Sequence, residues 1–352
     1  MAWDATPDHK TVVRAHWGRF HEAFGTVLYD FTDTDGLRPQ ITARVLGPDR
    51  YQEINRTNPS GNAVDPNVEQ AFMDQVLVGV EREVLRDFGV KVQYIRRDFK
   101  DMFGYIDTKS IYAPVQVRDP GPDGVANNAD DGGPLTVFSL QNPGQGTFVL
   151  TNPDGAYRRY RAFQVVAQKR FSHNWQMLAS YTRSSSKGNV NNDITDNYGG
   201  NATTGPFVNP NNAVNAEGRN THDYPNEATL RGSYRIEKFG GLSVGAAWRY
   251  FSGNPWSRTA TFRLAQGNQV VRVAPRGTEP SAAFNQLDFR VDKTVNLGAR
   301  SRRLGIYVDV FNATNQGISD RGRYTELSGG TFGIPLGWVA PRTVQAALRL
   351  MF

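Results

Sequence analysis

The sequence predicts an all-β protein, in which an antiparallel meander of about ten transmembrane strands forms a partial outer-membrane β-barrel with long extracellular loops. Three observations support this prediction. The chain ends in an alternating strand, the other candidate strands come in pairs joined by very short turns, and long polar segments separate the pairs. Together they predict a location in the outer membrane of a Gram-negative bacterium.

The last ten residues, TVQAALRLMF, alternate between apolar and polar positions. The apolar row, which we predict to be the signal for barrel assembly, is Val344, Ala346, Leu348, Leu350 and Phe352. Alternation that ends at an aromatic residue is typical of a terminal transmembrane strand, with one face toward lipid and the other toward a polar lumen. An edge strand of a soluble β-sandwich alternates in the same way, so the remaining strands must decide between the two.

The other candidate strands also alternate, and most of them form pairs. A lone strand is expected at 11–20. The expected pairs are 76–84 with 88–94, 163–168 with 175–181, 230–236 with 242–250, and 287–292 with 304–310. Each pair is joined by a turn of a few residues, such as Arg86-Asp87. Short turns of this kind predict antiparallel hairpins.

The segments between the pairs are long and rich in Gly, Asn, Asp and Pro. They are 23–73, 99–156, 187–225, 253–285 and 313–337. Loops longer than about 15 residues are uncommon in compact soluble domains. Alternation of tiny turns and long loops is instead the layout of an outer-membrane barrel, with short periplasmic turns and long extracellular loops. If Phe352 ends at the periplasmic side, every short turn also falls on that side.

Composition agrees with a barrel and excludes several other classes. The chain of 352 residues has no Cys, which excludes disulfides and thiolate metal sites. Its mean hydropathy is −0.52, and no run approaches the roughly 20 apolar residues of a spanning helix. The net charge of +6 is scattered, so no nucleic-acid partner is predicted.

The first residues, MAWDATPDHK, lack the basic start and apolar run of a signal peptide. An outer-membrane protein must be exported, so we expect this chain to be part of a longer protein. Residues 1–4 are interpreted as the tail of a preceding inward strand, which predicts that the strands begin in mid-barrel.

Several segments carry a resemblance to a known family. They are KTVVRAHWGRFHEAF (10–24), DQVLVGVERE (74–83), QKRFSHNWQMLASYTRSSSKG (168–188), YFSGNPW (250–256), QLDFRVDKTVNLGARSRRLGIYVDVFNATNQ (286–316) and the PRTVQAALRLMF end. Their order and spacing resemble the C-terminal barrel of TonB-dependent receptors, particularly the Oar-like group with a carboxypeptidase-regulatory-like domain. By this resemblance, residues 1–352 correspond to the C-terminal part of such a barrel. The family's signal peptide, TonB box, plug domain and roughly the first half of a 22-stranded barrel have no counterpart here.

The resemblance implies a receptor whose parent imports or binds a large nutrient, such as an oligosaccharide, a peptide or a metal chelate. It implies contact with TonB only through the N-terminal region that this chain lacks. Outer-membrane lipid and the barrel assembly machinery are the other expected partners. The alternative is a non-transporting surface or adhesion barrel that acts through its long loops.

One local motif suggests a metal site. The segment DPGPDGVANNADDG concentrates oxygen ligands, namely Asp119, Asp123, Asn127, Asp130 and Asp131. Calcium takes six to eight such oxygens from flexible loops, but the spacing does not match an EF-hand. A solvated turn cluster explains the same residues, and the sequence favours it over calcium. No other cofactor is expected.

Other polar residues are interpreted structurally. A charge ladder that faces the lumen is expected, with a substrate path as the alternative, because its members alternate with apolar residues; they are Arg231, Arg235, Asp288, Arg290, Asp292, Asp309 and Arg349. The acids of the 189–224 loop (Asp193, Asp196, Glu217 and Asp223) are interpreted as solvated, although ligand binding is the alternative. No enzyme motif occurs, and a site built from His16, His21 and the 184–186 serines is the remaining catalytic alternative.

Overall fold

The computed structural model of the chain describes residues 1–21, 40–48, 50–57, 63–190, 205–298, 302–317 and 324–352. Strands dominate these residues, and helix is limited within them to α3 (Pro210–Ala213) and the 3-10 turn η1 (Glu237–Phe239). Among the described residues, no helix has the length and apolar character needed to cross a membrane.

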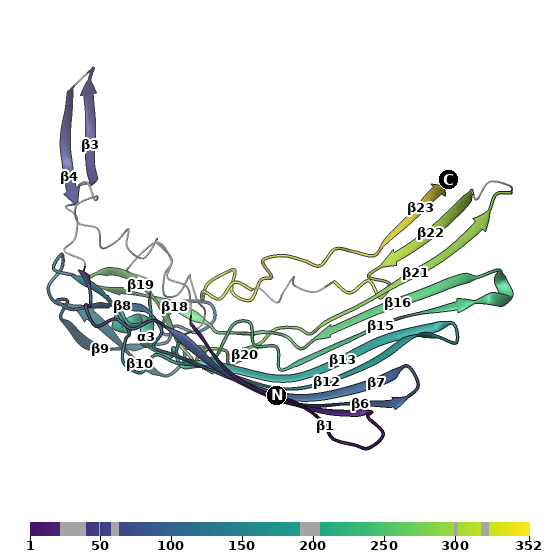
Figure 1. Cartoon of the computed structure of the whole chain (residues 1–352). Coiled ribbons are helices and arrows are strands. Elements are labelled where there is room, and N and C mark those ends of the chain that lie inside the picture. The colour runs from purple at the N-terminus through teal and green to yellow at the C-terminus, as the bar shows by residue number, and fades with distance from the viewer. Residues whose placement is uncertain (22–39, 49, 58–62, 191–204, 299–301, 318–323) are drawn as a thin grey trace.

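Eleven strands follow one another across a single curved sheet in chain order (Figure 1). They are β1 (Ala2–Asp4), β2 (Thr11–His21), β6 (Phe72–Leu85), β7 (Phe88–Lys100), β12 (Arg158–Ser172), β13 (Trp175–Gly188), β15 (Asn226–Ile236), β16 (Leu242–Phe251), β21 (Phe284–Asn296), β22 (Arg303–Phe311) and β23 (Thr343–Met351). Every neighbouring pair is antiparallel, and β1 and β23 lie at opposite edges and do not pair with each other. The predicted meander is therefore confirmed, including the short inward strand before residue 11.

The short turns match the right-handed twist of the strands that they connect. His173 and Asn174 alone separate β12 from β13, and both have positive φ, at 52° and 66°. Two positive φ values in a two-residue loop are typical of a type I′ turn, whose twist suits a hairpin and whose conformation Asn tolerates. This geometry explains why so few residues suffice on this side of the sheet.

The strand register gives the sheet one apolar and one polar face. Directly opposite residues in antiparallel strands lie on the same face. Phe289 faces Val310 across β21 and β22, and Ile306 faces Leu348 across β22 and β23. Continuing these rows places one set of apolar residues on the same face, namely Leu287, Phe289, Val291, Ile306, Val308, Val310, Leu348 and Leu350.

Several strands extend beyond their predicted ends on the loop side. Strand β7 continues to Lys100 rather than residue 94, and β13 continues to Gly188 rather than residue 181. Most of the added residues are polar, with Ile95 and Phe99 of β7 as the apolar members, and polar residues on both faces are expected where a strand leaves the bilayer and meets water on both sides. Alternation therefore ends before the strand does.

The long connections fold into small sheets at one end of the main sheet (Figure 1). These sheets pair β3 (Gln40–Gly47) with β4 (Arg50–Thr57), β11 (Phe148–Thr151) with both β5 (Ala63–Val64) and β8 (Gly104–Asp107), β9 (Tyr112–Arg118) with β10 (Pro134–Leu140), β17 (Pro255–Trp256) with β20 (Glu279–Pro280), and β18 (Thr259–Leu264) with β19 (Gly267–Arg272). Strand β14 (Gly218–Arg219) adds to the end of β13.

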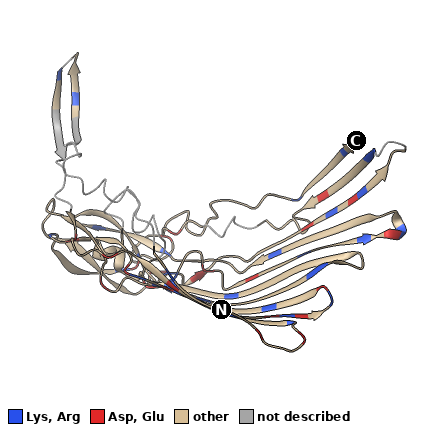
Figure 2. Cartoon of the chain, in the orientation of Figure 1, with Lys and Arg blue, Asp and Glu red and all other residues tan. Residues whose placement is uncertain are grey.

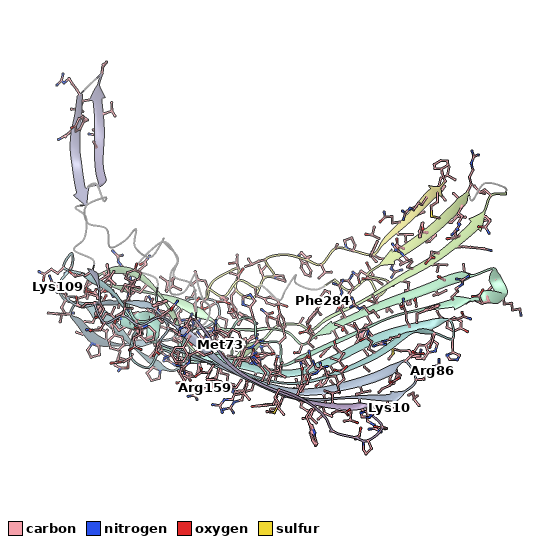
Figure 3. All side chains as sticks on the ribbon, in the orientation of Figure 1. Lys10, Met73, Arg86, Lys109, Arg159 and Phe284 are labelled. Carbon is pink, nitrogen blue, oxygen red and sulfur yellow. The ribbon has the colours of Figure 1, made fainter. Side chains whose placement is uncertain are left out.

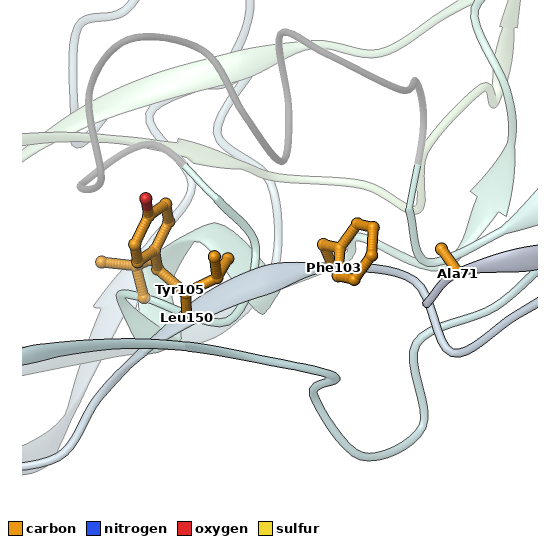
Figure 4. Packing of buried hydrophobic residues seen from close by; sticks show 5 residues of the cluster. Ala71, Phe103, Tyr105 and Leu150 are labelled. Atoms are coloured by element: carbon orange, nitrogen blue, oxygen red, sulfur yellow. The ribbon is translucent and has the colours of Figure 1, made fainter. Parts of the chain in front are cut away.

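The buried apolar residues of the described chain gather mainly in these loops. One cluster contains Phe103, Tyr105 and Leu150 beside Ala71 and Val208 (Figure 4). A second cluster contains Val137, Ala260, Phe262 and Val271 from two different loops. A single barrel sheet faces lipid on one side and the lumen on the other, so a water-excluding core forms where loops pack together.

Candidate functional site

The concave face of the sheet carries the predicted charge ladder. Register places all seven ladder residues on the face opposite to the apolar rows, and Figure 2 shows basic and acidic residues along β21 and β22. Arg290 and Asp309 face each other and form a bidentate pair, with Nε–Oδ1 at 2.6 Å and Nη2–Oδ2 at 2.8 Å. Arg249 lies 3.6 Å from Asp288 one strand away. Paired charges of this kind are tolerated on a lumen face and would be costly in lipid.

Neutral side chains continue this polar surface toward the N-terminal strands. Gln164 on β12 donates to Thr182 on β13 at 3.2 Å, and Ser180 on β13 bonds to Thr229 on β15 at 2.7 Å. A hollow of about 740 Å³ opens on the sheet beside Arg231 and the Arg290–Asp309 pair. The concave face thus offers both hydrogen-bonding groups and charges to whatever occupies the lumen.

The extracellular loops are joined to one another by specific polar contacts. The buried Asn211 side chain accepts from the Phe138 backbone N–H at 2.8 Å and donates to its carbonyl at 2.7 Å. The hydroxyl of Tyr157 donates to Glu217 at 2.6 Å, and this hydrogen bond raises the pKa of Tyr157. These contacts tie the 101–157 loop to the 189–225 loop, so the loops form one packed layer.

A carboxylate at the end of β8 organises one corner of this layer. Burial tends to raise the pKa of Asp107, but the hydroxyl of Ser110 and the backbone N–H groups of Lys109, Ser110 and Thr147 together hold the pKa below its ordinary value. The three backbone donors lie 3.1, 3.1 and 3.2 Å from Asp107 Oδ1. The ionised carboxylate therefore stabilises the turn after β8 and its contact with the start of β11.

The predicted metal loop is the tip of the β9–β10 hairpin. The first predicted ligand, Asp119, is buried. Its carboxylate accepts hydrogen bonds from both Nη1 and Nη2 of Arg258, with Nη1–Oδ1 at 2.7 Å. The same Arg258 nitrogen lies 3.1 Å from the hydroxyl of Ser328. The pair links three extracellular loops, because Asp119, Arg258 and Ser328 come from different connections. A cation from the protein thus already balances this carboxylate.

The other acids of the loop bind mainly to neighbouring amides. Asp123 accepts from the Val125 N–H at 2.8 Å, and Asp131 accepts from the Asn127 N–H at 2.9 Å. Asp130 lies 3.4 Å from the Asp123 N–H. No group of three or more His, Cys, Asp or Glu residues converges on a metal-binding point in the described parts of the chain. Calcium binding at 119–132 stays a prediction.

The acids of the 189–224 loop differ in burial and in hydrogen-bond partners. Asp223 is buried, pairs with Arg219 at 2.9 Å and accepts from the Ser186 N–H at 2.9 Å. Asp193 and Asp196 lie outside the described residues. Asp223 therefore holds the backbone and is buried, in contrast to the sequence interpretation, whereas Glu217 is exposed and accepts from the Tyr157 hydroxyl.

The geometry agrees with a known protein family. The family described as outer membrane beta barrel domain matches residues 1–270. The chain belongs to this family. It is therefore a protein of the Gram-negative outer membrane.

Solved structures of other outer-membrane proteins share the fold of this β-barrel domain. It is similar to the outer membrane transporter YddB from Escherichia coli, with a TM-score of 0.57 and 11% sequence identity. It is also similar to the ferripyoverdine receptor of the outer membrane of Pseudomonas aeruginosa, with a TM-score of 0.50 and 9% identity. Each match covers 99% of this chain, which spans 39% of YddB and 31% of the receptor. Curated protein sequences give no match.

The C-terminal row of this barrel domain lies on the lipid-facing side of β23. Val344, Leu348 and Leu350 face Val310, Ile306 and Leu304 of β22. Leu348 is 73% exposed and Phe352 is 86% exposed. The row is therefore placed to contact lipid, and its role as an assembly signal stays a prediction.

The alternative catalytic group does not come together. His16 lies on β2 and the 184–186 serines lie on β13, with β6, β7 and β12 between them. Neighbouring strands are about 4.8 Å apart, so these groups are separated by roughly 19 Å.

Sequence reasoning missed Arg258 and Asp107 as organising residues of the loop layer. Arg258 meets Asp119 across 139 positions of sequence, and no local pattern marks that contact. Asp107 does carry a local signal, because Asp followed by Lys109 and Ser110 is typical of a turn in which the side chain caps backbone N–H groups.

Proposed function

We propose that this chain forms the C-terminal part of the barrel of a TonB-dependent receptor of the Oar-like group, whose parent imports or binds a large nutrient. The observation that carries the proposal is the wide, open, polar sheet. Eleven antiparallel strands curve around a concave polar face, yet β1 and β23 do not meet. A barrel of about 22 strands encloses a plugged lumen, and this sheet has the curvature of a part of such a wall.

The chemistry of the concave face supports a plugged lumen. A plug domain is itself a folded protein, so it needs hydrogen-bonding partners and compensated charges along the wall. The Gln164–Thr182 and Ser180–Thr229 contacts and the Arg290–Asp309 pair supply both kinds of group. In the proposed receptor, TonB acts on the N-terminal region of the protein, and displacement of the plug opens the path.

The packed loop layer supports capture of a large ligand at the cell surface. Its two apolar clusters and its inter-loop hydrogen bonds hold the loops in fixed positions. Rigid loops lose less conformational entropy on binding than free ones. An oligosaccharide, a peptide or a metal chelate is the proposed class of nutrient, and calcium in the 119–132 loop is a proposed structural ligand of this layer.

The test compares a host that makes the full-length protein with strains lacking its gene or TonB. Labelled oligosaccharides, peptides and metal chelates are supplied, and surface-bound label is separated from internalised label. Uptake that requires both this protein and TonB supports the proposal. Loss of the gene without any change in binding or uptake across the three classes would refute it.

The alternative from the sequence, a surface or adhesion barrel, is favoured by the self-contained packing of the loops. Its signature is binding that needs this protein but persists unchanged without TonB, with no internalised label. In either case we propose that the barrel assembly machinery inserts the protein and that lipid contacts its convex face.

A further inference from the structure

The convex, outward face of the sheet carries basic side chains just beyond its apolar band. They lie on β7, β12 and β13, which are neighbours in the sheet. We call this group the basic belt, and it consists of Arg96, Lys100, Arg159, Arg161, Arg183 and Lys187. Figure 3 shows Arg159 on the convex side of the sheet. All six side chains are exposed, and none belongs to the polar network of the lumen.

The belt lies at a defined depth in the membrane. Along each of the three strands, the outward face changes from aliphatic to aromatic and then to arginine toward the extracellular loops. The three aromatic–arginine steps are Tyr94 to Arg96, Phe163 to Arg161, and Tyr181 to Arg183. Aromatic girdles mark the bilayer interface. Two residues of strand span about 7 Å, so the arginines reach the level of the lipid headgroups.

The belt brings like charges together. Arg96 and Arg161 are directly opposite each other across β7 and β12, an arrangement that destabilises a sheet in the absence of a counter-charge. Arg96 binds Asp98, with Nε–Oδ2 at 2.7 Å. Among the described residues, Arg161 forms no ion pair. The strand register thus creates a local excess of positive charge.

Few acids compensate this excess. Asp98 is the acid on the same face within these three strands, and it is shared between Arg96 and, at 3.8 Å, Arg159. Arg183 donates to the neutral Asn226 at 2.8 Å. On the β13 side, the neighbouring strand β15 places the neutral Asn226 opposite Arg183. On the β7 side, Asp74 of β6 lies opposite Asp98 and 3.6 Å from Lys100. Asp74 also pairs with Arg19 of β2. Two acids therefore face more basic side chains than they can neutralise, and the excess positive charge is centred on β7, β12 and β13.

We propose that the basic belt binds phosphate-bearing headgroups of the outer-leaflet lipid, with the acyl chains against the apolar rows below. Arginine forms charge-assisted, bidentate hydrogen bonds with phosphate. A phosphate between Arg96 and Arg161 supplies the counter-charge that the sheet lacks. The apolar rows on β7, β12 and β13 run directly beneath the belt, so one lipid contacts both. This proposal is independent of nutrient uptake.

The test measures binding of lipopolysaccharide to the full-length protein in neutral detergent. The Arg161→Gln/Arg183→Gln variant removes two charges from the belt, and the matched Arg231→Gln/Arg235→Gln variant removes two charges from the lumen face. Each charge that is removed should lower the affinity for lipopolysaccharide about fivefold, so the belt variant should bind about 30-fold more weakly than wild type. The lumen variant should change binding less than about twofold, and wild type should bind phosphatase-treated lipopolysaccharide more weakly.

A charge-retaining variant and a comparison of two lipids test the proposal further. The Arg161→Lys/Arg183→Lys variant retains charge and should retain most of the binding. If the Gln variant does not fold, as judged by heat-modifiable mobility, the proposal is tested by wild type alone. Wild type should then bind native lipopolysaccharide more tightly than dephosphorylated lipopolysaccharide. Equal binding of both lipids, equal losses in the belt and lumen variants, or displacement by inorganic phosphate at the same concentration as the lipid would each overturn the proposal.

Discussion

The salt bridge between Arg258 and Asp119 is predicted to hold the β9–β10 hairpin tip against the rest of the loop layer. The change is Arg258→Met, which keeps an unbranched apolar stem but removes the charge. The Arg258 side chain is 17% exposed and that of Asp119 is 9% exposed. Removing the Arg258 charge from this buried pair leaves the Asp119 carboxylate with one remaining hydrogen bond among the described residues, from the Gly121 backbone N–H at 3.1 Å.

The magnitude follows from this burial. Breaking a buried ion pair by removing one partner costs about 3–5 kcal/mol, and the lower end applies because Asp119 keeps the Gly121 hydrogen bond. A loss of about 3 kcal/mol in the free energy of local opening corresponds to about 150-fold faster exchange of the protected amides. The amides that report on it are those of Asp119 and Gly132, which bond across the base of the tip.

The assay is hydrogen exchange followed by mass spectrometry on peptides covering 112–140 of the full-length protein in detergent. The control is Arg263→Met, because Arg263 is exposed on the neighbouring β18. Exchange in the control should match wild type. Exchange in Arg258→Met within twofold of wild type would refute the assignment of the pair as the main restraint on the tip.

The same assay tests the calcium prediction. Exchange is measured in millimolar calcium and in chelator, for wild type and for Asp123→Ala/Asp130→Ala. Calcium binding predicts slower exchange with calcium in wild type and no calcium effect in the double variant. Equal exchange of wild type in calcium and in chelator returns the loop to a solvated turn cluster held by Arg258.

Three further outcomes are expected. Leu348→Asp should reduce recovery of the full-length protein in the outer membrane several-fold because it places a charge against lipid, whereas Ala347→Asp on the lumen face should not; equal recovery of the two variants would contradict the face assignment. Deleting Phe352 should likewise lower the heat-modifiable, membrane-inserted fraction, and an unchanged fraction would remove this residue from the assembly signal. Asp107 has a lowered pKa, so its ionised form stabilises the fold above the ordinary aspartate pKa of about 4, and that contribution is lost as the pH falls through the lower folded value. Protection of β8 and β11 from proteolysis should therefore fall in acid, and Asp107→Asn should show lower protection at neutral pH with a flatter pH dependence; parallel pH profiles would refute this role.

The sequence alone determined the sheet and its orientation. The alternation of Leu348 and Leu350 with Ala347 and Arg349 has the two-residue period of a strand, and the period also gives the face of each residue. The turn at His173-Asn174 was visible because turn chemistry is local. The long loops indicated the extracellular side because only one side of a barrel carries them. Each of these signals depends on residues close together in the chain.

Only the tertiary structure decided what the polar residues contact. Arg258 reaches Asp119 across 139 positions, and Arg96 faces Arg161 because β7 and β12 become neighbours with one particular register. Strand ends such as Lys100 were also missed, because alternation ceases where both faces meet water. Local periodicity specifies which face a residue occupies, whereas its partner depends on the register and on loop packing. Those are set by contacts between distant segments, and no short stretch of sequence records them.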